Sequence, residues 1–421
     1  MDLIFAEATP PGRGGVSVVR ISGSGARAAA EMMAGPLPSP RQTYLRSLRD
    51  GDEVLDQALV IWFAAGESFT GEEVAELHLH GAPVIVRRVA ELLRGRGLRA
   101  AEAGEFTRRA FLNGRMDLAE IEGLGDLLDA ETEAQRQLAI RSAGGELARK
   151  TEEWRALLIR AGALVESSVD FADEEVPDDV PDEVFVLLNQ LVEGLDQEIG
   201  GFPAAERIRK GFEVAVIGPP NAGKSSLINR IAKRDVALVS EIAGTTRDII
   251  ELRLDLKGLA VTLLDTAGLR DTGDVVEQLG VERAKQRALA ADLRLHLSDD
   301  GSIYQDSFID GDLIIRGKAD QAAEGKGLAI SSVTGQGIDQ LLAEIFDRLS
   351  DRISGAGVTS HERQLNALVD ARQALVGLED LPPELLAEQI RQAAVSLDRL
   401  LGRIGAEEYL DVIFSSFCIG K

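Results

Sequence analysis

The first part of the chain mixes short strand-like runs with one amphipathic helix. Apolar and polar residues alternate in GVSVVRIS (15–22), QALVIWFA (57–64) and VAELHLHG (74–81), as they do in half-buried strands. In APVIVRRVAELLRGRG (82–97) the apolar residues recur at three- and four-residue spacing, which predicts a helix with one buried face. We therefore predict a compact α+β domain over residues 1–116.

The rest of the chain changes its hydrophobic period twice. Helical spacing dominates residues 117–210, apart from the run DFADEEVPDDVPDE (170–183), whose eight acidic residues and two prolines predict a solvated connector. At FEVAVIG (212–218) the pattern becomes that of a buried strand, and strands alternate with helices through residues 211–350. Helical spacing returns over residues 351–421. These changes predict an α/β domain inserted between two helical stretches that pack together as one bundle.

Composition limits the class of protein. A length of 421 residues suggests two or three domains, and one cysteine allows no internal disulfide. We see no membrane helix or secretory signal and expect a cytoplasmic protein. The net charge of −24 argues against a general basic surface that coats nucleic acid. Residues 1–115 hold 14 Arg, 14 Asp or Glu and no Lys. This exclusive use of arginine reflects either genomic bias or a site that binds an anionic ligand.

A phosphate-binding loop stands at the start of the α/β region. GPPNAGKS (218–225) follows a predicted strand, precedes a helical run and fits the pattern GxxxxGK[ST]. Gly218 and Gly223 allow the loop to turn its backbone N–H groups onto phosphates. Lys224 can reach the β- and γ-phosphates, and the hydroxyl of Ser225 can hold Mg²⁺. The motif in this setting predicts a nucleotide site.

Three further motifs lie downstream at the spacing of a GTPase: AGTTRD (243–248), LLDTAG (263–268) and RGKAD (316–320). Asp265 stands at a predicted strand end, where a carboxylate can hold Mg²⁺ through water, and Gly268 can sense a γ-phosphate. Asp320 can accept the N1 and amino protons of guanine, and ISSVTGQG (330–337) resembles a loop that closes over the base. We therefore predict guanine rather than adenine as the base.

Several positions depart from the usual pattern. Gly317 stands where the Asn of Asn-Lys-x-Asp ties guanine to the phosphate loop, so we predict weaker nucleotide affinity with guanine preference retained. Leu269 stands where many GTPases have a water-orienting Gln, so hydrolysis must recruit another polar group or be slow. Arg294 and His296 interrupt the predicted buried strand LRLHLSDD (293–300), where apolar residues are expected.

These motifs and both chain ends resemble the MnmE (TrmE) family of bacterial tRNA-modification GTPases, within the TrmE-Era-EngA-YihA-Septin-like group. The resemblance is carried by GPPNAGKSSLINRI, VALVSEIAGTTRDIIE, LLDTAGLRDTGDVVEQLGVERA, ATPPGRGGVSVVRISG, SFTGEEVAELHLHGAPVI, GEFTRRAFLNGRMDLAEIEG and the terminal FSSFCIGK. It implies a multidomain α+β and α/β fold. The family has a folate-binding, dimerising N-terminal domain, a helical bundle domain split in sequence, and an inserted Ras-like P-loop GTPase domain.

The resemblance also implies the residues of the GTPase site. The implied GTP-binding residues are Asn221, Ala222, Gly223, Lys224, Ser225, Ser226, Ser240, Glu241, Ile242, Ala243, Gly244, Thr245, Thr246, Asp265, Thr266, Ala267, Gly268, Lys318, Asp320, Ser331, Ser332 and Val333. In the family K⁺ offsets charge at the phosphates, and its implied ligands are Asn221, Ser240, Ile242 and Thr245. The implied ligands of Mg²⁺ are Ser225 and Thr246. Glu282 in GVERA matches the family's water-orienting carboxylate, which answers the problem that Leu269 raises.

A second implied site binds a one-carbon tetrahydrofolate, or 5-formyl-tetrahydrofolate as its analogue. Its residues by motif match are Arg20, Glu76, Arg115 and Lys421. Arg115 replaces an expected lysine, which preserves the charge but not the shape. Cys418, in the terminal CIGK, would act there as a thiolate or base. From the residues alone, a buried structural thiol is the ordinary alternative, and Gly and Lys disfavour a prenylation box.

The resemblance implies a function in tRNA modification. With a flavin- and NADH-dependent partner, MnmG (GidA), the homodimer would add a carboxymethylaminomethyl or aminomethyl group to C5 of the wobble uridine. The folate would supply the methylene, and glycine or ammonium the nitrogen. Because the chain is acidic, we expect tRNA to be held by the partner or by a local basic patch. The rival readings are a GTP-dependent ribosome-assembly factor and a regulatory GTPase without modification chemistry.

Overall fold

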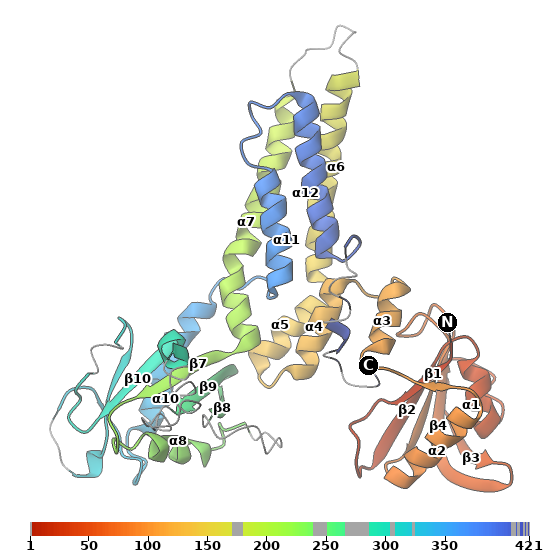
Figure 1. The fold of residues 1–421 in the computed structure, drawn as a ribbon, viewed down its shortest axis with the longest axis horizontal. Coiled ribbons are helices and arrows are strands. Elements are labelled where there is room, and N and C mark those ends of the chain that lie inside the picture. The colour runs from red at the N-terminus through yellow and green to blue at the C-terminus, as the bar shows by residue number, and fades with distance from the viewer. Residues whose placement is uncertain are drawn as a thin grey trace, which may run out of the picture. The chain divides into compact units, whose positions relative to one another are not determined.

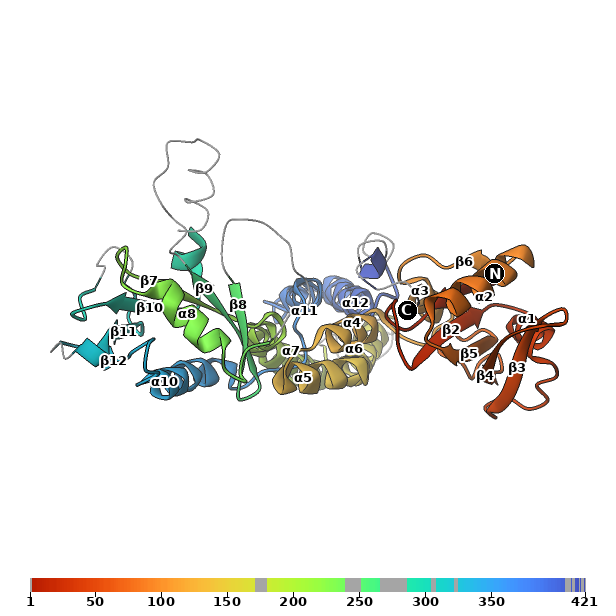
Figure 2. The same cartoon turned by 90° about the horizontal axis from the view of Figure 1, so that it is seen from below.

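Two sheets with their helices organise the part of the chain that the structure describes (Figures 1 and 2). The computed structural model describes residues 2–170, 180–238, 251–265, 286–303, 308–321, 325–405, 410, 413–415, 417 and 420. They form two compact units, the first from residues 1–125 and 394–421 and the second from residues 126–393. Among these residues no helix is long and apolar enough to cross a membrane.

The sheet of the first unit has six strands in the order β3-β4-β5-β2-β1-β6. The strands are β1 (Ile4–Glu7), β2 (Val16–Ser22), β3 (Tyr44–Asp50), β4 (Glu53–Phe63), β5 (Val74–His80) and β6 (Arg99–Ala100). All neighbours are antiparallel except β1 and β6, which run parallel. The three alternating runs of the sequence correspond to β2, β4 and β5, which confirms the predicted strands.

The two faces of this sheet differ in what covers them. Helices α1 (Ala26–Ala34) and α2 (Pro83–Gly95) pack on one face, in a core that includes Val19, Ile21 and Leu77. The predicted amphipathic helix is therefore confirmed as α2. Helix α3 (Glu105–Leu112) contributes the buried Phe106 to a cluster with Ile4 and Ala6. The side chains between the buried ones along β2 and β5 face away from α1 and α2, and these include Arg20, Glu76 and His78.

The predicted long helical region after the first domain consists of several helices: α4 (Leu118–Asp129), α5 (Glu133–Ala143), α6 (Glu146–Asp170) and α7 (Asp182–Lys210). The break before α5 is a capping box, in which Thr132 and Gln135 satisfy each other's backbone N–H groups. The break before α6 includes Gly145 at φ 75°, a conformation that favours glycine. Most residues of the predicted acidic connector, 171–179, lie outside the described part.

The second helical stretch packs on the first. Helix α11 (Glu362–Ala374) lies against α7, and Ile390 of α12 (Pro383–Leu400) approaches Gly162 of α6. Glu198 of α7, only 3% exposed, accepts hydrogen bonds from the backbone of Val358 and Thr359. This buried carboxylate therefore anchors the segment that leads from the α/β region back into the helices.

The α/β region between the helices has a second six-stranded sheet, in the order β12-β11-β10-β7-β9-β8. Its elements are β7 (Phe212–Ile217), α8 (Lys224–Ala232), β8 (Glu251–Leu256), β9 (Leu259–Asp265), β10 (Leu293–Ser298), β11 (Leu313–Arg316), η3 (Ala319–Gln321), β12 (Leu328–Ala329), α10 (Ile338–Ser350) and η4 (Asp351–Ile353). Its pairs are parallel except β8 with β9. Since β7 and β10 are neighbours, their carboxyl ends meet at one edge, where ligands bind in such sheets.

The polar residues in β10 are accommodated by one buried acid. All six positions of β10 are buried, including Arg294 and His296. Asp312, in the turn before β11, accepts hydrogen bonds from Nε of Arg294 at 2.9 Å and from Nε2 of His296 at 3.1 Å. Arg294 also donates to two backbone carbonyls. The buried charges are thus paired, and the strand keeps its place in the sheet.

Candidate functional site

The phosphate loop joins β7 to α8 in a shape that its glycines permit. A Cβ atom at Gly218 would lie 2.0 Å from the carbonyl oxygen of Leu297 on β10, so this approach allows no side chain. Gly223 precedes α8 at φ 94°, and Asn221 also has a positive φ of 66°. The backbone therefore curls around the N-terminus of α8, where unpaired N–H groups favour an anion.

Lys224 lies inside this loop. Its side chain is buried, and Nζ donates to the carbonyl oxygens of Gly218 at 2.7 Å and Pro219 at 3.0 Å. Burial lowers the pKa of Lys224, although the nearby carboxylate of Asp265 opposes this shift. Asp265 ends β9 beside β7, and it is 4% exposed. A phosphate would give the buried ammonium a charged partner in place of neutral carbonyls.

The predicted base-binding residues follow β11 and β12. Asp320 lies in η3, and the side chain of Lys318 forms an ion pair with Asp299 at 2.7 Å. The backbone of Gly317 donates to Ser298 at 2.8 Å. A Cβ atom at Gly317 would have the carbonyl oxygen of Ala222 in the phosphate loop 3.4 Å away. The position that lacks the usual Asn therefore lies directly beside the phosphate loop.

The first unit holds a separate polar site on the face of the sheet away from α1 and α2. Nε of Arg20 on β2 donates to Oε1 of Glu76 on β5 at 2.9 Å, in a directly paired register. The guanidinium also lies 5.9 Å from the ring of Phe69 and 5.8 Å from that of Phe106, within cation–π range. Its Nη1 donates to the carbonyl oxygen of Gly420 at 3.4 Å. The C-terminal segment thus reaches this site.

Glu76 has a second partner that the sequence analysis missed. Nε2 of His78 lies 3.2 Å from Oε2 of Glu76. The pKa of Glu76 is lowered, first by the hydrogen bond from His78, against the opposing effect of burial, and then by Arg20. The signal was present in the sequence, because residues two apart in the strand VAELHLH share one face of the sheet.

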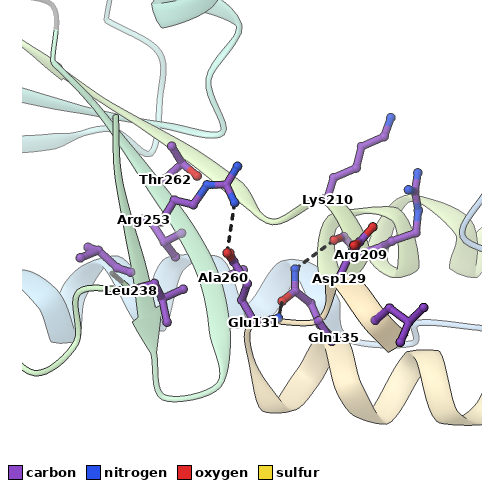
Figure 3. A pocket seen from close by; sticks show the side chains of 13 residues that line it. Asp129, Glu131, Gln135, Arg209, Lys210, Leu238, Arg253, Ala260 and Thr262 are labelled. Atoms are coloured by element: carbon purple, nitrogen blue, oxygen red, sulfur yellow. Dashed lines mark hydrogen bonds and ion pairs between the residues drawn. The ribbon is translucent and has the colours of Figure 1, made fainter. Parts of the chain in front are cut away.

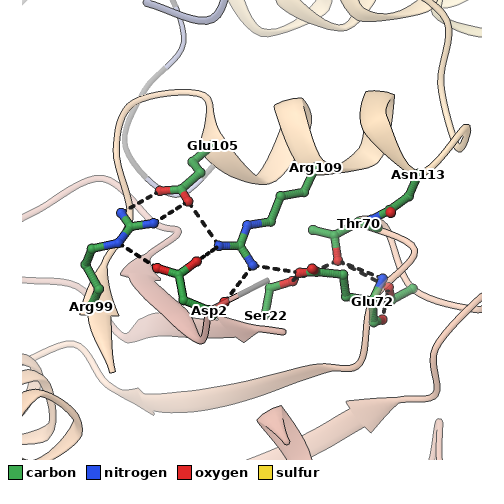
Figure 4. A network of polar contacts seen from close by, with 9 residues as sticks. Asp2, Ser22, Thr70, Glu72, Arg99, Glu105, Arg109 and Asn113 are labelled. Atoms are coloured by element: carbon green, nitrogen blue, oxygen red, sulfur yellow. Dashed lines mark hydrogen bonds and ion pairs between the residues drawn. The ribbon is translucent and has the colours of Figure 1, made fainter. Parts of the chain in front are cut away.

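Figure 4 shows an ionic network around Arg109 in the same unit. Arg109 of α3, whose side chain is 4% exposed, donates to Glu72 at 2.9 Å, Asp2 at 2.8 Å and Glu105 at 3.1 Å. Arg99 of β6, whose side chain is 45% exposed, forms ion pairs with the same Asp2 and Glu105. The network joins the start of the chain, β6 and α3 to the loop before β5, and so supports the strand that carries Glu76.

A cavity of about 600 Å³ lies within the second unit, where the β8–β9 hairpin meets α5 and the end of α7 (Figure 3). Arg253 of β8 and Glu131 form an ion pair across it at 3.1 Å. The side chain of Gln135 donates to the carbonyl oxygen of Arg209 at 3.1 Å. These bonds tie the α/β sheet to the helices through the β8–β9 hairpin, which follows the motif AGTTRD (243–248) and ends inside LLDTAG (263–268).

Comparison with known proteins decides the family. A model of the MnmE helical domain matches residues 118–418, and a model described as GTP-binding protein TrmE N-terminus matches residues 3–115. The chain belongs to the MnmE family. Its relatives include proteins named tRNA modification GTPase MnmE from Paracoccus denitrificans, 62% identical over 421 residues, and Cereibacter sphaeroides, 52% identical over 432 residues. Both matches cover 100% of this chain and of the relative.

Solved structures match a smaller part of this chain than the full-length relatives do. An Era variant from Aquifex aeolicus bound to GDP and AlF4⁻ is 25% identical, with 41% of this chain and 69% of that chain covered and a TM-score of 0.26. The resemblance inferred from the motifs is confirmed by the family matches and the full-length relatives alone.

The structure brings together part of the predicted MnmE-type sites. It places Asn221, Lys224 and Asp265 at one edge of the second sheet, with Ser225 and Ser226 at the start of α8 and Ala222 next to Gly317. Ser331 is buried and Val333 is 77% exposed in the loop after β12. In the first unit Arg20 and Glu76 are paired, whereas Arg115 packs against Gly71.

Other predicted residues lie outside the described part of the chain, so their roles stay predictions. They are Ser240, Glu241, Ile242, Ala243, Gly244, Thr245, Thr246, Thr266, Ala267, Gly268, Leu269, Glu282, Cys418 and Lys421.

Proposed function

We propose that this chain is a GTP hydrolase that acts in tRNA modification. The observation that carries the proposal is the phosphate loop, with Lys224 buried inside it, in a chain whose full-length relatives are named tRNA modification GTPases. The α/β region fits the nucleotide, because Asp265 and the N-terminus of α8 converge on the loop.

The nucleotide site would work by positioning and charge. Lys224 would leave its two carbonyl partners for the β- and γ-phosphates, while Ser225, Thr246 and Asp265 would hold Mg²⁺, which neutralises charge that develops on the phosphates. Glu282 would orient the attacking water, since Leu269 cannot. We further propose a K⁺ site formed by Asn221, Ser240, Ile242 and Thr245. Asn221 fits because it lies in the phosphate loop, where its positive φ of 66° contributes to the curl of the backbone before α8.

We propose that the first unit binds a one-carbon tetrahydrofolate through Arg20, Glu76, Arg115 and Lys421. The fit rests on Glu76, a carboxylate kept ionised by its two partners, which can accept two N–H groups of a pterin edge. The guanidinium of Arg20 can pair with an acidic group of the same ligand. The carbonyl oxygen of Gly420 accepts a hydrogen bond from Arg20, which supports a role for the residues next to it in sequence, Cys418 and Lys421.

The finer parts of the function are proposals of the same kind. The chain would work as a cytoplasmic homodimer with an MnmG-type flavoprotein on the wobble uridine of certain tRNAs. Its parts would be an N-terminal domain (1–116), a helical domain (117–210 with 351–421) and a GTPase domain (211–350). The acidic surface favours a partner or a local basic patch as the holder of tRNA.

The test is a deletion strain of the source organism whose tRNA nucleosides are analysed by mass spectrometry. We expect loss of the C5-modified wobble uridine, restored by the wild-type chain but not by Lys224→Ala. Unchanged nucleosides in the deletion strain would end the proposal. Unchanged nucleosides together with a ribosomal-subunit defect would favour the assembly-factor reading instead.

A further inference from the structure

Glu76 is held at both of its carboxylate oxygens. Arg20 bonds Oε1 at 2.9 Å, and His78 bonds Oε2 at 3.2 Å. The side chains are 17% exposed for Glu76, 21% for Arg20 and 35% for His78, so the group is partly shielded from water. Two bonds at opposite oxygens fix the rotation of the carboxylate plane, which neither bond would do alone.

The strand geometry explains why His78 reaches this position. Residues 76 and 78 lie on the same face of β5, because side chains alternate along a strand. On the neighbouring strands, residue 78 stands opposite Val18 of β2 and Leu59 of β4, which present no charge. A carboxylate can only accept hydrogen bonds, so Nε2 of His78 must be the donor.

A fixed carboxylate plane matters for recognition of a planar ligand edge. Each oxygen of Glu76 retains a lone pair beyond the one that its protein partner occupies. Two parallel N–H donors, such as the N–H and amino groups of a pterin, can then bond both oxygens at once. Such paired bonds to a carboxylate are strong only when the plane is aligned with the donors.

We propose that His78 is a positioning residue for Glu76 in the reduced-folate site. The inference rests on the proposed folate function of Arg20 and Glu76. His78 would not take part in bond making. It would hold the carboxylate in the plane that the pterin edge requires, from the side opposite Arg20.

The test compares two substitutions in the full-length protein. His78→Gln keeps an N–H donor at similar reach, whereas His78→Leu removes it at similar bulk. The probe is 5-formyl-tetrahydrofolate, and its Kd is measured by calorimetry. We expect His78→Leu to weaken binding about tenfold, because the lost bond is to a charged group, and His78→Gln to stay within about threefold of wild type.

A matched control separates positioning from stability. His80→Leu makes the same change two residues further along β5, where His80 pairs with Asp56 at 2.6 Å instead of Glu76. We expect the control to leave the Kd unchanged, and all three variants to keep the wild-type rate of GTP hydrolysis. Because Asp56 is buried, His80→Leu should lower the thermal midpoint at least as much as His78→Leu does, so loss of folate affinity in His78→Leu alone is not an effect of stability. In the modification assay, His78→Leu should raise KM for the folate and leave kcat unchanged.

The outcomes distinguish the inference from the function on which it rests. Wild-type affinity in His78→Leu, or equal loss in the Gln and Leu variants, overturns the role of His78 when Glu76→Ala abolishes binding in the same assay. If the wild-type chain does not bind the probe, or Glu76→Ala binds it normally, the proposed folate site is wrong and the inference falls with it.

Discussion

At the scale of single residues, Gly317 shows how one missing side chain alters a site. The usual Asn would tie the base-recognition segment to the phosphate loop, and the neighbouring atoms leave room for its Cβ atom. A Cβ atom at residue 317 would lie 3.4 Å from both Ala222 O and Leu297 Cδ1, which is ordinary contact distance. The backbone at Gly317 does not need a positive φ, so an L-residue fits there without strain.

We therefore predict that Gly317→Asn strengthens guanine-nucleotide binding. The new amide can donate to the carbonyl oxygen of Ala222, and one such bond is worth about 1 kcal/mol, or roughly fivefold in Kd. Titration with a fluorescent GDP analogue measures the change. Asp320→Asn serves as the control, because it should abolish guanine selectivity without repairing the gap. Unchanged affinity in Gly317→Asn would contradict the assigned role of this position.

At the scale of elements, the network of Arg109 decides how the first unit is held together. Arg109 is enclosed by Asp2, Glu72 and Glu105, whereas Arg99 bonds two of the same acids with its side chain 45% exposed. If Arg109 is replaced by an apolar residue, the largely buried Glu72 loses its only cation among the described residues, whereas Asp2 and Glu105 keep Arg99. If the exposed Arg99 is replaced by an apolar residue, water takes its place beside the carboxylates.

We predict that Arg109→Met destabilises the first unit by about 3 kcal/mol and Arg99→Met by less than about 1 kcal/mol. The chain has two tryptophans, Trp62 in the first unit and Trp154 in the second. In a Trp154→Phe background, urea unfolding followed by fluorescence therefore reports on the first unit alone. Equal effects of the two substitutions would show that burial of Arg109 does not matter.

The same network makes the first unit sensitive to acid. The pKa of Asp2 is lowered, chiefly by its bond to Arg99, and that of Glu105 is lowered by Arg99 and Arg109 against the effect of burial. A carboxyl group whose pKa is lowered by folding binds fewer protons in the folded state than in the unfolded state. The stability that Asp2 and Glu105 contribute is therefore present above about pH 4 and is lost below it. Arg99→Met should flatten this acid limb more than Arg109→Met in the same fluorescence assay.

The elements themselves could largely be predicted from the sequence, because their signals are local. Alternation gave β2, β4 and β5, and helical spacing gave α2 and α7. How β10 tolerates Arg294 could not be predicted from the sequence, because the compensating Asp312 lies outside the strand. Arg20 and Glu76 could be assigned to one site only through the family resemblance, since their pairing joins two strands. The role of His78 could not be predicted either, because it depends on the same pairing of Arg20 with Glu76.

At the scale of the whole chain, the last residues return to the first unit. Phe414 and Phe417 pack with Leu118 and Ile121, and Gly420 lies against the backbone of Glu7 and Ala8. The carbonyl oxygen of Gly420 accepts a bond from Arg20. In the sequence, the only cysteine, Cys418, stands between Phe417 and Gly420. Any chemistry of Cys418 at the proposed folate site therefore depends on how the C-terminal segment is docked.

Gly104 is the point where this docking can be tested. It precedes α3 at φ 66°, and a Cβ atom there would lie 2.4 Å from the carbonyl oxygen of Phe414. Gly114 follows the same helix at φ 65°, and no atom lies within 4 Å of its Cβ position. Alanine costs about 1–2 kcal/mol of backbone strain at either position. At Gly104 alone, the alanine side chain also clashes with Phe414 and so displaces the C-terminal segment.

We predict that Gly104→Ala abolishes wobble-uridine modification in cells and weakens 5-formyl-tetrahydrofolate binding at least tenfold, while GTP hydrolysis keeps its wild-type rate. Gly114→Ala should retain modification and folate binding, because it carries the backbone strain without the clash. Nucleoside mass spectrometry, calorimetry and phosphate release measure the three properties. If both variants lose modification equally, strain in the first unit is responsible. Loss of GTP hydrolysis in Gly104→Ala alone would mean that the C-terminal segment also serves the nucleotide site, and that the two activities cannot be separated at this contact.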